Sequence, residues 1–114
     1  MNLSLAATLL LIAAVAVGIY LLFLGLRKRK RSPGIGLMHA VLALSGVTVL
    51  FTEIFIGPIV KLNNVAALFL FFAIVGGGIV LALHEEKRPP SMAAVTVHAI
   101  MGVAGVSLLI ISLF

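Results

Sequence analysis

The chain has 114 residues, of which 63% are hydrophobic and only 10% are charged. A soluble domain of this length needs more polar residues to cover its surface. The net charge of +5 at pH 7 would suit a nucleic-acid-binding protein, but the basic residues are confined to short segments between apolar runs, which argues against one. Cysteine is absent, which excludes disulfides and thiolate metal sites.

Four apolar segments account for most of the chain, and each is near the roughly 20 residues that a helix needs to cross a bilayer. They are Leu3–Leu26, Ile35–Ile56, Val65–Leu83 and Met92–Phe114. The first segment is too long for a secretory signal and is followed at once by a basic run, so we expect it to be retained as an anchor. The sequence therefore predicts an all-α integral membrane protein with four transmembrane helices in contact with the lipid bilayer.

The distribution of basic residues predicts the topology. Five of them, Arg27–Arg31, follow the first apolar segment, and Lys87 and Arg88 follow the third, whereas the loop after the second contains only Lys61. By the positive-inside rule, loops 27–34 and 84–91 are cytoplasmic and both termini lie outside. We expect the plasma (inner) membrane.

The sequence aligns with itself without a gap at an offset of 59 residues. Between Leu5–Leu50 and Asn64–Leu109, 15 of 46 positions are identical, among them several residues that are uncommon in membrane helices. These pairs are Gly18 with Gly77, Lys28 with Lys87, Arg29 with Arg88, Ser32 with Ser91, His39 with His98, and Gly46 with Gly105. The alignment predicts two tandem helical hairpins, residues 1–60 and 61–114, in an up-down bundle with a pseudo-twofold axis along the membrane normal.

Each hairpin carries one histidine at the same place in its second helix. Ser32 before Pro33, and Ser91 after two prolines, are expected to cap these helices. His39 and His98 then lie at equal depth, about 10 Å from the cytoplasmic end. Ionisable residues inside a membrane are costly and usually face the bundle interior, so this pair is the main functional candidate.

Small residues surround both histidines in the sequence. The positions four and seven residues after each histidine share its helix face. They are Ala43 and Gly46 in the first hairpin and Gly102 and Gly105 in the second, while Gly18 and Gly77 fall at a similar level on the other two helices. Such faces commonly allow close helix packing without any ligand. They could also make room for a flat porphyrin held between two histidine ligands.

The layout of four helices with paired histidines resembles that of small four-helix b-type membrane cytochromes. That resemblance implies haem b, with His39 and His98 as axial ligands to the metal. Families with two stacked haems use two histidine pairs, whereas this chain has one. One haem near the cytoplasmic side does not carry electrons across the bilayer by itself, so a quinone, another membrane subunit or a homo-oligomer would be needed.

Three functions follow as hypotheses. The first is an electron-transfer subunit with one bis-histidine haem, not itself a catalyst. The second is a cofactor-free accessory or assembly subunit of a larger, respiratory-type membrane complex. The third is a small proton-coupled transporter that uses Glu53 and the histidines, although Glu53 is expected near the outer surface. His84 is not repeated, since Gly25 is its counterpart in the first hairpin, and it is expected at the cytoplasmic interface. Met38 and Met101 are expected to be apolar filling rather than copper ligands.

Overall fold

The computed structural model describes residues 3–27, 33–85 and 92–114, and this part of the chain forms four α-helices. Each helix is long and apolar enough to cross a membrane, which confirms the predicted class of fold. The helices are α1 (Leu3–Leu26), α2 (Pro33–Ile56), α3 (Lys61–Glu85) and α4 (Met92–Ser112).

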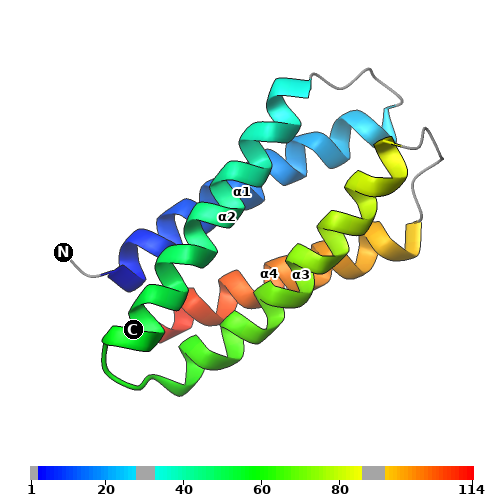
Figure 1. The fold of residues 1–114 in the computed structure, drawn as a ribbon. Coiled ribbons are helices and arrows are strands. Elements are labelled where there is room, and N and C mark those ends of the chain that lie inside the picture. Colours follow the sequence, from blue (N-terminus) through cyan, green and yellow to red (C-terminus); the bar gives the residue numbers. More distant parts are fainter. Residues whose placement is uncertain (1–2, 28–32, 86–91) are drawn as a thin grey trace. The chain divides into compact units, whose positions relative to one another are not determined.

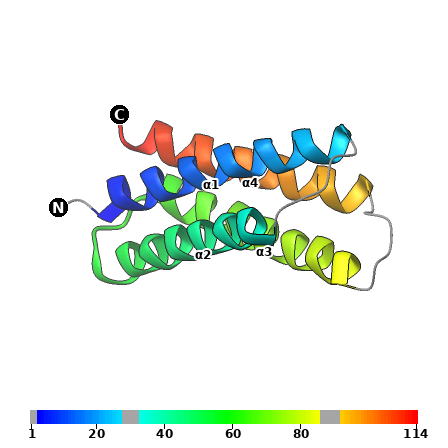
Figure 2. The same cartoon turned by 90° about the horizontal axis from the view of Figure 1, so that it is seen from above.

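The chain divides into two compact units, Met1–Gly57 and Pro58–Phe114, here called hairpin 1 and hairpin 2. In hairpin 1, α2 returns along α1, and in hairpin 2, α4 returns along α3 (Figures 1 and 2). The helices of each pair are therefore antiparallel neighbours, and each hairpin has packed residues of its own.

The third helix is longer than its apolar segment predicts, because it begins at Lys61 rather than Val65 and continues to Glu85. Its first turns include Asn63, which is only 3% exposed. The Ser112 hydroxyl of α4 donates a hydrogen bond to Asn63 Oδ1 at 2.9 Å. A polar side chain with a partner on the neighbouring helix can lie within the packed hairpin, so the helix need not end where hydropathy falls.

The residues that face each other along the interface between α3 and α4 follow a single register. Leucine and glycine meet at Leu70 and Gly105, where a Cβ built on the glycine would lie 2.6 Å from the leucine Cγ. The layers along this seam are Asn63 with Ser112, Ala66 with Leu109, Leu70 with Gly105, Ala73 with Gly102, and Gly77 with His98. Successive layers are three or four residues apart, which is the spacing of helices that pack knobs into holes. At two of these layers a large side chain faces a glycine on the other helix: Leu70 faces Gly105 and His98 faces Gly77.

Hairpin 1 has the same seam 59 residues earlier. A Cβ on Gly46 would again lie 2.6 Å from a leucine Cγ, here that of Leu11. The matching steps place Ala7 opposite Leu50, and neither side chain is exposed at all. Within the described part of hairpin 2, the buried leucines and valine and two of the three buried alanines are identical to their counterparts in hairpin 1, and Ala67 is the exception.

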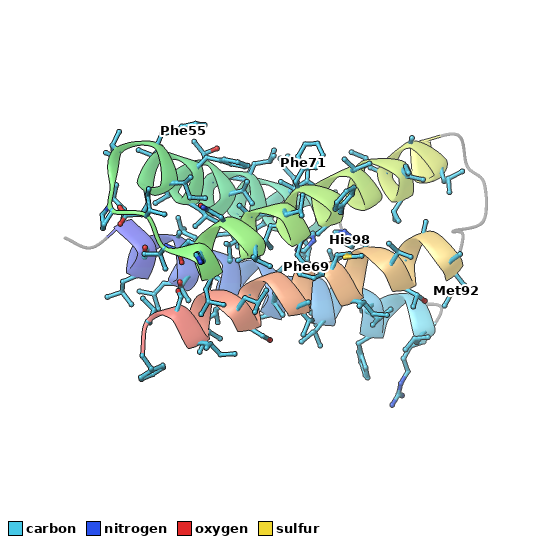
Figure 3. The ribbon with its side chains drawn as sticks, turned by 90° about the horizontal axis from the view of Figure 1, so that it is seen from below. Phe55, Phe69, Phe71, Met92 and His98 are labelled. Atoms are coloured by element: carbon cyan, nitrogen blue, oxygen red, sulfur yellow. The ribbon has the colours of Figure 1, made fainter. Side chains whose placement is uncertain are left out.

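The remaining helix faces carry large apolar side chains that are exposed. Phe55 is 80% exposed and Phe71 is 51% exposed, and both project away from the helices in Figure 3. For a membrane protein such faces are expected to contact lipid chains. Buried polar side chains are all hydrogen-bonded: among the described residues, no buried side-chain nitrogen or oxygen lacks a hydrogen-bond partner.

The Leu70–Gly105 layer gives the first prediction. Replacing Gly105 by alanine forces a methyl group against Leu70 Cγ, so hairpin 2 should be destabilised by about 1–3 kcal/mol through overpacking. Adding Leu70→Ala to Gly105→Ala should cost less than the sum of the single changes, because the second change relieves the clash produced by the first. Unfolding in mixed detergent micelles, followed by circular dichroism, measures these free energies.

Gly78→Ala is the matched control, because a Cβ at Gly78 has nothing within 4 Å. It should not lower the free energy of unfolding, and the higher helix propensity of alanine should raise it by up to about 1 kcal/mol. If Gly105→Ala were as mild as Gly78→Ala, the seam would not be a close-packed interface.

Candidate functional site

His39 lies on α2 and reaches across hairpin 1 to the backbone of α1. Its ring nitrogen Nδ1 is 2.8 Å from the carbonyl oxygen of Ala14. The imidazole lies against Gly18, where a Cβ would be 2.9 Å from Cε1. The side chain is half-buried, so it belongs to the α1–α2 interface.

His98 repeats this arrangement in hairpin 2. Its Nδ1 is 2.6 Å from the carbonyl oxygen of Ala73, and a Cβ on Gly77 would be 2.9 Å from its Cε1. Figure 3 shows His98 in the middle part of α4, on the side that faces α3. All three residues, Ala73, Gly77 and His98, stand 59 positions after their counterparts in hairpin 1. The two histidines thus have the same local partners.

The hydrogen bonds define which ring nitrogen carries the hydrogen. A backbone carbonyl oxygen only accepts, so Nδ1 of each histidine must be the donor. In the neutral imidazole, the lone pair then resides on Nε2. Nε2 is a common metal-binding atom of histidine, and a metal-bound histidine usually donates its other ring N–H to a carbonyl or a carboxylate.

The small residues predicted beside a cofactor have nearer neighbours within their own hairpins. Leu11 contacts Gly46, Leu70 contacts Gly105, and the Cβ of Ala73 lies 4.0 Å from a Cβ built on Gly102. Gly18 and Gly77 lie under the imidazoles, and Ala43 is half-buried at the position that the register places opposite Ala14. The space beside Gly46 and Gly105 is therefore used by leucine, and that beside Gly18 and Gly77 by histidine, of the same hairpin.

The sequence-based interpretation missed three features. The carbonyl groups of Ala14 and Ala73 are the partners of the histidines, and Leu11 and Leu70 fill the positions beside the later glycines. The Asn63–Ser112 hydrogen bond was also missed. The spacing of three and four residues along each helix was the available signal, because it gives the antiparallel register from which these contacts follow.

Glu53 lies at the opposite end of the hairpin 1 seam from His39. The register places it opposite Ser4, which is 7% exposed. Its carboxyl group turns toward the end of its own helix, so that a Cβ on Gly57 would lie 2.9 Å from Oε1. Glu53 and His39 are therefore at different levels of the seam.

Few other predicted polar residues lie in the described part of the chain. Arg27 follows α1, and its guanidinium carbon lies 5.0 Å from the centre of the Phe23 ring. The structure does not describe the other basic residues that were predicted to lie in the first and third loops. It also does not describe the predicted helix caps Ser32 and Ser91. His84 belongs to α3. Within residues 3–27, 33–85 and 92–114, no three His, Cys, Asp or Glu side chains come together as a metal-binding group.

Comparisons with family models, with curated proteins and with solved structures found no match to this chain. The functional argument therefore depends on the residues described above.

The equivalence of the two histidine sites can be tested by stability measurements on the haem-free chain. His39→Ala and His98→Ala each remove one interhelical hydrogen bond. Each should lower the free energy of unfolding by about 0.6 kcal/mol, the average found for such bonds in membranes, and by no more than about 1.7 kcal/mol. Detergent unfolding followed by circular dichroism should give similar values for the two variants.

Thr52→Ala is a suitable control, because the exposed Thr52 hydroxyl bonds only to its own helix, at the Thr48 carbonyl. It should have a smaller effect than either histidine change. A large effect from one histidine and none from the other would contradict the equivalence.

Proposed function

We propose that the chain is a small integral membrane haem-binding protein in which His39 and His98 are axial ligands of haem b. The supporting observation is that each imidazole donates Nδ1–H to a backbone carbonyl. This hydrogen bond leaves the lone pair on Nε2 and holds the ring in one orientation. A fixed tautomer with an oriented ring is what a ligating histidine requires.

The donor set fits the iron of a b-type haem. Histidine is an established axial ligand of haem iron, and the apolar helices around each imidazole provide the low polarity that tunes such a cofactor. The glycines do not support the proposal in the way that the sequence hypothesis expected. Gly46 and Gly105 accept leucine side chains, so they bring the helices of each hairpin together instead of clearing room beside a macrocycle.

Bound haem would supply one-electron chemistry, and this chain's residues would bind and orient it. We therefore propose an electron-transfer subunit rather than a catalytic one, working with a quinone, another membrane subunit or a second copy. The chain would tune the haem through the type of its ligands, the orientation of the imidazole rings and the burial of the cofactor.

We further propose that the two hairpins are tandem copies of one unit, related by a pseudo-twofold axis along the membrane normal. The self-alignment at an offset of 59 residues supports this, as does the match between the contacts of His39 and those of His98. The basic residues of loops 27–34 and 84–91 favour a cytoplasmic location for these loops, with both termini outside the plasma membrane.

A second candidate is a cofactor-free accessory subunit of a larger membrane complex. One observation favours it: leucine and histidine side chains already occupy the glycine positions within each hairpin. Such a protein would co-purify with specific partners in mild detergent, and His39→Ala would leave that association intact. A stable, solitary, coloured protein would count against it.

The haem hypothesis predicts an absorbance spectrum. Purified protein, or haem-free protein supplied with haem b, should show a Soret band and resolved α and β bands after reduction. His39→Ala and His98→Ala should each lose haem or convert it to a five-coordinate form, whereas His84→Ala should retain the parent spectrum. Folded wild-type protein that stays colourless after haem addition would refute the proposal.

Haem content must be compared with folded yield to separate ligation from packing. The histidine variants should lose haem while their helical circular dichroism signal is kept. Gly46→Leu, in contrast, places a large side chain against Leu11 and should reduce folded yield. If all these variants lost yield and haem in proportion, the histidines would be packing residues rather than ligands.

A further inference from the structure

We infer that Gly18 and Gly77 are positioning residues for the two histidines, because each keeps open the backbone carbonyl to which an imidazole binds. The inference concerns the haem-free chain and goes beyond the proposed function, since it holds whether or not haem binds. It rests on the relation between each glycine and the alanine four residues before it.

In an α-helix, the carbonyl of residue i accepts the backbone N–H of residue i+4. The Cα–Cβ bond of a helical residue tilts toward the N-terminus, so the side chain at i+4 lies over the turn that contains residue i. A side chain at position 18 would therefore cover the Ala14 carbonyl, and one at position 77 would cover that of Ala73. Glycine at both positions leaves these carbonyls accessible from the neighbouring helix.

The distances show that the imidazole takes this space. A Cβ at Gly18 would lie 2.9 Å from His39 Cε1 and 3.3 Å from Nδ1, and a Cβ at Gly77 would lie 2.9 Å and 3.2 Å from the same atoms of His98. The nearest atoms thus include the hydrogen-bonding nitrogen and the carbon next to it. A methyl group there would push the ring away from the carbonyl that Nδ1 contacts.

The consequence is a change of tautomer. The hydrogen bond that one ring nitrogen makes decides which nitrogen of a neutral imidazole carries the hydrogen. With the Ala73 carbonyl accessible, His98 carries it on Nδ1. With that carbonyl covered, the preference is lost and the Nε2–H tautomer becomes populated. Gly18 and Gly77 therefore control the state of Nε2 without touching it as ligands.

The test is nitrogen NMR of ¹⁵N-histidine-labelled, haem-free full-length protein in detergent micelles near pH 8. Signals are assigned by replacing each histidine in turn. In the wild-type chain, both His39 and His98 should show the Nδ1–H tautomer. Gly77→Ala should introduce the Nε2–H tautomer at His98 and leave His39 unchanged, and Gly18→Ala should do the reverse.

Gly78→Ala and Gly36→Ala are the matched controls, because a Cβ at either glycine has nothing within 4 Å. Both should retain the wild-type tautomers. Circular dichroism verifies that each variant stays helical, and if one glycine variant fails to fold, the variant in the other hairpin decides.

Two results would overturn the inference: an Nε2–H tautomer at both histidines of the wild-type chain, or an unchanged Nδ1–H tautomer at His98 in folded Gly77→Ala. Failure of haem binding would not affect either measurement. A protein that never binds haem could still confirm the positioning role, and the outcomes of the two proposals are therefore distinguishable.

Discussion

Close approach of the two helices is the interaction on which each hairpin depends. In a bilayer, lipid chains are as apolar as leucine, so helices associate through tight packing and interhelical hydrogen bonds rather than through burial of apolar area. The seam provides both. Leu11 packs at Gly46 and Leu70 at Gly105, and an imidazole packs at the glycine two layers away. Leu70 faces Gly105, and sliding the helices by one layer in one direction would instead bring Leu70 against Leu109, which disfavours that shifted register.

The register also resolves the problem of placing histidine in a membrane segment. An imidazole surrounded by apolar groups needs hydrogen-bond partners, because unpaired polar groups are costly there. His39 finds the Ala14 carbonyl, and His98 finds the Ala73 carbonyl, each within its own hairpin. This bond stabilises the hairpin and directs the lone pair to Nε2. Structural hydrogen bonding and metal ligation are thus compatible roles, since they use different nitrogens of one ring.

The sequence was sufficient to predict the helices and to pair two histidines whose local contacts match, because both depend on patterns along the chain. Apolar length predicts helices, and an ungapped alignment pairs His39 with His98. The role of the glycines was harder to predict. A small residue creates a hole, but only the antiparallel register shows which side chain enters it. At Gly46 that side chain is Leu11. Without the register, the sequence allowed close helix packing and a bound porphyrin as equal explanations of this glycine. The start of α3 was misplaced for a similar reason, since Asn63 is polar in sequence but is hydrogen-bonded across the seam.

The two hairpins differ most clearly at the end of the seam away from the histidines. Asn63 and Ser112 in hairpin 2 correspond to Ser4 and Glu53 in hairpin 1, and Ala67 corresponds to Thr8. Sequence differences are spread along the hairpins, since only 15 of 46 aligned positions are identical. The set of alanine, glycine and histidine is nevertheless the same in both. Close packing alone accepts many combinations of small and large residues, as the divergent end shows. The shared set has a stricter geometric requirement. It needs a carbonyl group that accepts the hydrogen bond, a glycine that leaves space beside this carbonyl, and an imidazole that reaches it from the neighbouring helix. Loss of the glycine or the histidine removes the hydrogen bond, so the set acts as one unit.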